Sequence, residues 1–323
     1  MTHLQVGIKG TMVMLYKQAK LFKLTNKFTF SKEEFAEKLE QLRFRDCPPS
    51  MTHSLGWVPP VGDEEDAPLV QAQNGYFAVC LQIEEKILPP IVLRQELAKK
   101  IKFIQARDDR KIYKKEKNSL QDEIMTTLLP RAFTKISQIH AYFDTKKSCM
   151  VLSTTNEKRT EQFITMIKKT IGDGIEVYDI EKLSQSLTHW LQHQSYPSTF
   201  AIEKSCVLQD QNQTNRVIRC QHQDLFATSI QSFIKEGCVV KQLAIEWQDH
   251  VSFILVNNFS LQSIRFKDEL ISQTSELEIE SAQQKFVADF FILTETMSKL
   301  YQELLQALEN ANSADIVPMA SNS

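Results

Sequence analysis

Residues 94–117 read RQELAKKIKFIQARDDRKIYKKEK and carry ten Lys or Arg side chains against four Asp or Glu. The segment is therefore net +6, whereas the chain is −2 overall, so the remaining residues sum to −8. Because no Pro or Gly interrupts residues 91–117, we expect one helix from Ile91, about 27 residues and roughly 40 Å long. Its apolar stripe would hold Leu97, Ile101 and Ile104. Beside it would run a cationic stripe of Lys100, Arg107, Lys111 and Lys114.

This charge concentration has two interpretations. A long cationic helix face is suited to holding a polyanion, because clustered charge raises the local concentration of the opposite sign. The alternative is an ordinary solvated helix with Lys-rich flanks. The segment by itself does not separate the two.

The composition is that of a globular protein. At 323 residues the chain is long enough for two or three compact units. Its 42% hydrophobic and 24% charged residues are ordinary values. We find no apolar run long enough for a membrane span and no secretory signal, so we expect a cytoplasmic protein. The six scattered cysteines, without CxxC spacing, predict free thiols in a reducing compartment.

Nucleotide, metal and catalytic motifs are not recognisable. Only eight glycines occur, and neither GxGxxG nor GxxxxGK[ST] is present, so we expect no nucleotide cofactor. His189 and His193 have the spacing of zinc ligands, but Trp190 stands where the zincin motif requires Glu. We therefore expect no metal site, and a solvated loop at the acidic residues 63–66. Nothing local supports a Cys–His nucleophile.

The remaining pattern predicts an α+β fold. Ser31 and Glu34 form a capping box that opens a helix through about Leu42. A second helix should start near Ser119 and end at Pro130, making a projecting helical hairpin with the basic helix. Further helices are expected at about 157–171, 226–235 and 282–308. Strands are expected at about 15–24, 76–83, 136–143, 150–153, 175–178, 200–208, 216–219, 239–247, 251–256 and 261–266. We expect these strands to form several small mixed sheets with packed helices.

Breaks in composition predict three folded regions and two disordered ends. A discontinuous central α+β region would span 14–90 and 134–195, and the basic hairpin 91–133 would be inserted in it. A C-terminal α+β region would span 196–310. Residues 1–13 and 311–323 are expected to be disordered, and Met14 is an alternative start to Met1.

Six short passages together resemble one family, the recombination-associated protein RdgC of proteobacteria. They are LGWVPP at 55–60, EEKILP at 84–89, KKEKNSL at 114–120, LLPRAF at 128–133, LAIEWQ at 243–248 and VADF at 287–290. Each passage is short, but all six occur in the family's order, across about residues 14–308.

The resemblance implies a non-enzymatic protein that binds duplex DNA with little sequence preference. It further implies a ring-shaped homodimer with a positively charged hole, associated with the nucleoid, that restrains RecA-driven strand exchange. In the family a phenylalanine of the PRAF passage helps close one dimer contact, which here falls on Phe133. A Lys-Gln pair at the other contact corresponds to His222 and Gln223. The DNA-contacting set would be Lys100, Arg107, Arg110, Lys111, Lys114, Lys115, Lys117 and Arg131.

Two further functions stay open from the residues alone. The basic helix could grip an acidic protein partner, making the chain an interaction scaffold. The other possibility is a nuclease with an unrecognised site, although nucleases normally cluster carboxylates for metal ions.

Overall fold

Local signals place several helix ends where the sequence predicts them. The computed structural model describes residues 16–62, 66–178, 180, 182–267, 270 and 281–314, without the side chains of residues 282 and 310–314. The Ser31 hydroxyl accepts from the Glu34 N–H while the Glu34 carboxylate accepts from the Ser31 N–H, which confirms the predicted capping box. The helix expected at about 157–171, α4 (Glu157–Ile171), ends at Gly172, whose φ of 89° favours glycine.

The described residues contain seven α-helices and one short 3₁₀ turn. The helices are α1 (Lys32–Glu40), α2 (Pro90–Asp108), α3 (Lys114–Leu128), α4 (Glu157–Ile171), α5 (Leu183–His193), α6 (Thr228–Lys235) and α8 (Ala282–Ala314), and the 3₁₀ turn is η1 (Leu129–Arg131). The strands are β1 (Ala19–Leu24), β2 (His53–Val58), β3 (Gln71–Gln73), β4 (Tyr76–Ile87), β5 (Phe133–Asp144), β6 (Cys149–Leu152), β7 (Ile175–Val177), β8 (Phe200–Asp210), β9 (Val217–Gln221), β10 (Cys238–Trp247), β11 (Val251–Val256) and β12 (Ser260–Phe266).

The α+β class is confirmed, but the expectation of several small mixed sheets is wrong. The named strands form one 12-stranded sheet in the order β2-β4-β5-β6-β1-β12-β11-β10-β8-β9, with β3 beside β4 and β7 beside β1. Every pairing between these strands is antiparallel. The strands of the two halves of the chain are joined into this one sheet by β1, which pairs with β12 through Ala19–Leu261 and Lys20–Ser260. Such a contact between distant segments leaves no trace in local hydrophobic patterning, and the division into regions stays a prediction.

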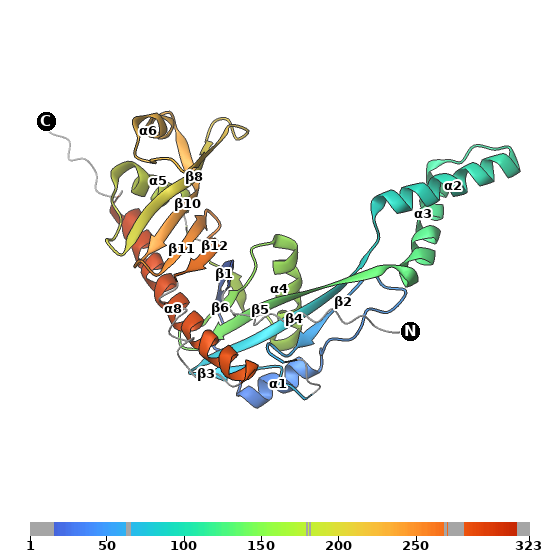
Figure 1. The fold of residues 1–323 in the computed structure, drawn as a ribbon, viewed down its shortest axis with the longest axis horizontal. Helices are drawn as coiled ribbons and strands as arrows, with labels where there is room; N and C mark the ends of the chain where they lie inside the picture. The colour runs from blue at the N-terminus through green and yellow to red at the C-terminus, as the bar shows by residue number, and fades with distance from the viewer. Residues whose placement is uncertain are drawn as a thin grey trace.

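Alternation along the strands gives the first half of the sheet a core on both faces. In β5, Tyr142 packs in the cluster that includes residues of α8, and its neighbour Phe143 packs in the cluster with Phe35 of α1 and Phe163 of α4. This is the period of two expected of a strand buried on both sides. Figure 1 shows α8 running along the sheet and the hairpin of α2 and α3 projecting from the far end of β4 and β5.

The predicted single helix over residues 91–117 is wrong. Helix α2 ends at Asp108, and α3 begins at Lys114 rather than near Ser119. Asp109 takes the left-handed conformation at φ 44°, which Asp tolerates better than most residues. Because the helix breaks there, Lys111 and Lys114 do not continue the stripe of Lys100 and Arg107. The N-terminal strand expected at 15–24 is shorter and starts at Ala19. The last helix runs to Ala314, past its expected end at about 308 and into the first four residues of the tail 311–323. Residues 1–13, the rest of that tail and most of the acidic loop 63–66 lie outside the described residues.

Gly56 lies where β2 approaches a neighbouring segment. Trp57 donates its N–H to the Leu42 carbonyl and accepts at its own carbonyl from the Phe44 N–H. A Cβ at Gly56 would lie 2.2 Å from the Phe44 Cα. Only glycine therefore permits this backbone contact, which accounts for the glycine of the LGWVPP passage.

We expect the buried His140 to make stability depend on pH. Burial lowers the pKa of His140 to about 4, so between about pH 6.5 and 4 the unfolded chain binds a proton that the native state excludes. The free energy of unfolding should therefore fall by on the order of 3 kcal/mol as pH drops through this window. His140→Gln should remove that part of the slope, measured by urea denaturation at several pH values. The exposed His53 supplies the control, His53→Gln, and an unchanged slope in His140→Gln would contradict the assignment.

Candidate nucleic-acid interface

The hairpin of α2 and α3 holds together through a small apolar core of its own. Leu97 of α2 packs with Leu120 and Ile124 of α3, and Ile101, Ile104 and other partly buried residues surround them. The predicted apolar stripe therefore faces α3, which leaves the opposite side of α2 to solvent. The hairpin itself projects from the end of β4 and β5 (Figure 1).

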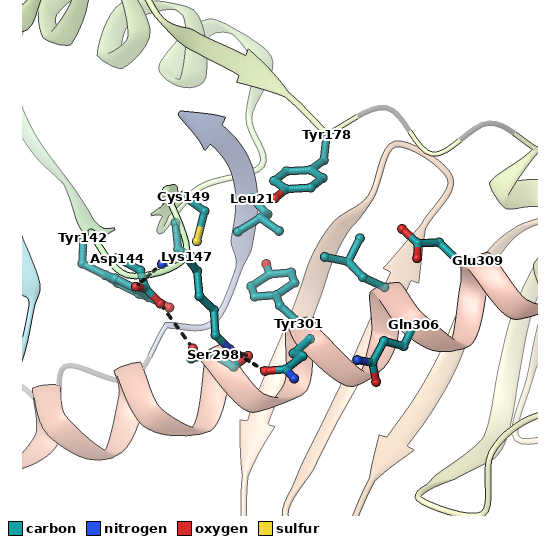
Figure 2. Close-up of a pocket in the computed structure, with 13 residues that line it drawn as sticks. Leu21, Tyr142, Asp144, Lys147, Cys149, Tyr178, Ser298, Tyr301, Gln306 and Glu309 are labelled. Atoms are coloured by element: carbon teal, nitrogen blue, oxygen red, sulfur yellow. Dashed lines mark hydrogen bonds between the residues drawn. The ribbon is translucent and has the colours of Figure 1, made fainter. Parts of the chain in front are cut away.

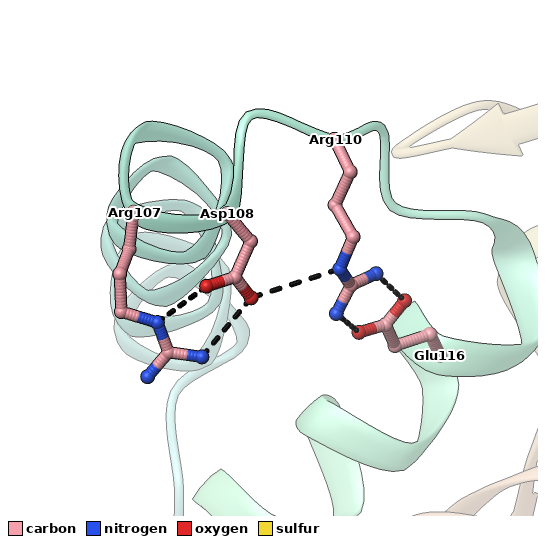
Figure 3. A network of polar contacts seen from close by, with 4 residues as sticks. All are labelled: Arg107, Asp108, Arg110 and Glu116. Atoms are coloured by element: carbon pink, nitrogen blue, oxygen red, sulfur yellow. Dashed lines mark hydrogen bonds and ion pairs between the residues drawn. The ribbon is translucent and has the colours of Figure 1, made fainter.

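Two arginine–carboxylate ion pairs stabilise the connection between the two helices. Arg110 lies between the helices and donates from both guanidinium NH2 groups to the Glu116 carboxylate, at 2.7 and 2.6 Å (Figure 3). Arg107 makes a second two-point contact, with Asp108, at 2.6 and 3.0 Å. Hydrogen bonding from Arg110 lowers the pKa of Glu116, and hydrogen bonding from Arg107 lowers the pKa of Asp108. Both carboxylates therefore stay ionised at neutral pH.

The structure divides the predicted DNA-contacting cations into two groups. Lys100, Arg107 and Arg110 form ion pairs within the hairpin, at 2.6 Å to Glu123, Asp108 and Glu116 respectively. The second group is exposed and forms no ion pair within the described residues, and its members are Lys111, Lys114, Lys115, Lys117 and Arg131. The second group can accept phosphate contacts without first giving up a protein carboxylate.

Three more side chains belong to this surface. Lys102 is exposed and without an ion pair in the part of the chain that is described. Phe103 and Tyr113 are 64% and 75% exposed among the cations, and the Arg107 guanidinium lies 6.0 Å from the Phe103 ring centre. Exposed aromatic rings within a basic surface are typical of proteins that contact nucleic-acid bases. The signal was present in the sequence, as aromatic residues interspersed with Lys and Arg.

Phe133 is not a core residue of the monomer. It opens β5, opposite Ile87 of β4, and is 84% exposed. Ile87 is also exposed, so the two make an apolar spot at the base of the hairpin. His222 and Gln223 follow β9, at the other end of the strand order. His222 has φ 53° and is exposed.

The other candidate chemistry finds no support in the described residues. His189 and His193 lie side by side on α5 with ring centres 4.6 Å apart, but no group of three or more metal-ligating side chains occurs in the described part of the chain. Cys80 lies 3.8 Å from His140; burial raises the Cys80 pKa and lowers the pKa of His140, the reverse of an activated pair. No helix among the described residues has the length and apolar character needed to cross a bilayer.

Comparison with known proteins covers nearly the whole chain. A family model described as "Putative exonuclease, RdgC" matches residues 14–311. The recombination-associated protein RdgC of Yersinia enterocolitica is 33% identical over 298 residues, which cover 92% of this chain and 98% of the relative. Proteins of the same name from Yersinia pestis and Yersinia pseudotuberculosis are 32% identical over the same length.

The match includes the basic hairpin and both ends of the sheet, so the α+β fold described above is that of a recombination-associated protein. The chain belongs to the RdgC family. Of the two descriptions, the first names an exonuclease and the second names recombination; neither decides whether this chain catalyses a reaction.

We expect Glu116→Gln to loosen the start of α3. The substitution removes the charge that holds Arg110. The first turn of α3 also contains the hydrogen bond from the Lys117 N–H to the Tyr113 carbonyl (2.9 Å), which should open more often once Arg110 is released. Amide hydrogen exchange in this turn should accelerate several-fold. Glu123→Gln makes the same charge change in mid-helix, where Lys100 is the partner, and should leave the first turn of α3 protected. Equal exchange rates in this turn for wild type and Glu116→Gln would show that the pair does not fasten it.

Proposed function

We propose that this chain binds duplex DNA without sequence preference and acts as a ring-shaped homodimer that restrains RecA-mediated strand exchange. The observation that carries the DNA-binding part is the set of exposed hairpin cations without carboxylate partners in the described structure: Lys111, Lys114, Lys115, Lys117 and Arg131. The family's association with recombination supports the same conclusion.

The physical basis of binding is phosphate neutralisation. Each Lys or Arg that contacts a phosphate releases condensed counterions, so affinity falls steeply with salt. Lysine side chains on exposed helix surfaces follow the phosphates but read no bases. A protein whose total charge is −2 can still bind DNA in this way, because the Debye length is only about 10 Å at 0.1 M salt and distant acidic residues are screened.

The shape of the chain supports assembly through its two ends. The sheet is curved, with the hairpin arm at one end and the β8, β9 and α6 arm at the other (Figure 1). A two-fold dimer joins each surface to its own copy, so one contact at Phe133 and one at His222 and Gln223 would close two such chains into a ring. Basic hairpins would then line the hole, and the dimer would obstruct a recombinase by occupying the duplex.

In this proposal the chain is not an enzyme. Incubation of purified protein with labelled duplex and single-stranded DNA, with and without magnesium, tests the point. Binding without shortening of either substrate is the expected result. Magnesium-dependent release of nucleotides would instead support the exonuclease description.

We expect the double reversal Lys111→Glu and Lys114→Glu to weaken duplex binding equally for unrelated sequences. The slope of log affinity against log salt should become shallower by roughly 0.9 for each phosphate that the variant no longer neutralises. Fluorescence anisotropy at several salt concentrations measures both quantities. The matched control is Lys27→Glu with Lys32→Glu, two exposed lysines near the start of α1. Unchanged DNA affinity in the hairpin variant would show that DNA binds to another surface of the protein. If the wild type binds an acidic protein but not DNA, and the hairpin variant loses that protein, the result would favour the interaction scaffold instead.

We expect Phe133→Ala to leave the monomer folded, because the ring is already in solvent, and to weaken one of two dimer contacts. A buried aromatic anchor can contribute about 2 kcal/mol or more to association. The second contact should keep some dimer intact, so the distinctive result is easier release from circular duplex in a competition assay. Val177→Ala, at another exposed apolar residue, is the control. Identical dimer dissociation and DNA retention in wild type and Phe133→Ala would exclude the contact.

A further inference from the structure

A cavity of about 380 Å³ lies between the central strands and α8 (Figure 2). Strands β1, β5 and β6 contribute one wall, with Leu21, Tyr142 and Val151. Helix α8 contributes the opposite wall, with Tyr301 and Leu305, and Tyr178 lies across from Tyr301. The size is that of a site for one small molecule. Aromatic and aliphatic side chains form part of the lining, and the polar residues of the lining are Asp144, Lys147, Ser298, Gln302, Gln306 and Glu309.

The Tyr301 hydroxyl is a polar group that the protein leaves unused. Tyr301 is 4% exposed, and its hydroxyl has no hydrogen-bond partner among the described residues. Figure 2 shows the hydroxyl directed into the cavity toward Leu21. A buried hydroxyl without a partner is costly, on the order of 1–3 kcal/mol. A ligand with a hydrogen-bond acceptor at this point would remove that cost.

Two of the charged residues at the cavity, Lys147 and Asp144, are held by contacts within the protein, and Glu309 also lines it. Lys147 donates its ammonium to the Ser298 carbonyl and to Oε1 of Gln302, both at 2.9 Å. Asp144 accepts from the backbone N–H groups of Lys146 and Lys147 and from the Ser298 hydroxyl. These contacts tie the β5–β6 turn to α8, and the tyrosine, leucine and valine side chains supply the apolar part of the lining. Burial raises the pKa of Cys149 to about 12, so its thiol is neutral at physiological pH.

We propose that this cavity binds an uncharged, planar bicyclic aromatic molecule whose carbonyl or ring nitrogen accepts a hydrogen bond from Tyr301. A flat ring system would pack between the tyrosine rings of the two walls, where offset or edge-to-face contact is favourable. An uncharged ligand avoids the desolvation that an ion would suffer in this apolar interior. The site lies away from the basic hairpin and does not depend on DNA binding. Because the ligand would contact both the sheet and α8, it would also stabilise their packing.

Umbelliferone, a fluorescent bicyclic lactone with a carbonyl acceptor, is a suitable probe when measured in its neutral form. Titration into the full-length protein should give saturable binding with one site per chain and raise the melting temperature. Tyr301→Phe deletes only the hydroxyl and should weaken binding about threefold to tenfold, the range of one net hydrogen bond. Leu305→Trp fills the cavity and should abolish binding.

The matched control is Tyr16→Phe. The Tyr16 hydroxyl is likewise buried without a partner in the described structure, but Tyr16 does not line the cavity, so this variant should bind as wild type does. Far-UV circular dichroism establishes that each variant is folded. If Leu305→Trp does not fold, the comparison of Tyr301→Phe with Tyr16→Phe decides. Failure of umbelliferone to saturate the wild type, binding retained in folded Leu305→Trp, or equal affinities in the two tyrosine variants would each overturn the proposal.

Discussion

The pairing of β1 with strands from both halves of the chain is the constraint on which the rest of the structure depends. Along its six residues, β1 (Ala19–Leu24) pairs with β6 on one edge and with β12 and then β7 on the other. Its link to β12 consists of two residue pairs, yet it converts two groups of strands into one sheet. Every residue of β1 except Lys20 and Lys23 is buried, because layers on both faces cover the strand. Substitutions that weaken this strand would therefore act on the relative placement of the two arms.

Helix α8 reinforces this narrow junction. Its Phe290 ring contacts Tyr142 of β5, at 6.0 Å between ring centres, and Glu303 accepts from the Trp247 indole of β10 at 2.9 Å. Helix α8 thus contacts strands of the sheet on both sides of β1. The cavity beside Tyr301 lies along this contact. A bound molecule there would stabilise the packing of α8 against these strands.

The hairpin shows how a weakly acidic protein can present a cationic surface. Three of its predicted DNA-contacting cations are engaged in internal ion pairs, which are exposed and so contribute little to global stability. Their role is geometric: the Arg110–Glu116 pair fixes the turn that reverses the chain. The remaining cations stay available, and Phe103 and Tyr113 add apolar surface beside them. The fold of the hairpin therefore does not depend on its unpaired cations, because the two helices pack through Leu97, Leu120 and Ile124.

The sequence by itself determined the local elements and the position of the charge. The capping box at Ser31, the helix α4 and the strands β10 to β12 rest on short-range signals, and each was predicted within a few residues. The net +6 segment follows from composition alone. Tertiary structure decided the rest. The break at Asp109 places Lys111 and Lys114 off the stripe of Lys100 and Arg107, and the carboxylate that pairs with Lys100 of α2 is Glu123 of α3. The single sheet, the exposure of Phe133 and the unused hydroxyl of Tyr301 depend on which distant segments meet, because pairing and burial are properties of three-dimensional contact that a one-dimensional pattern does not encode.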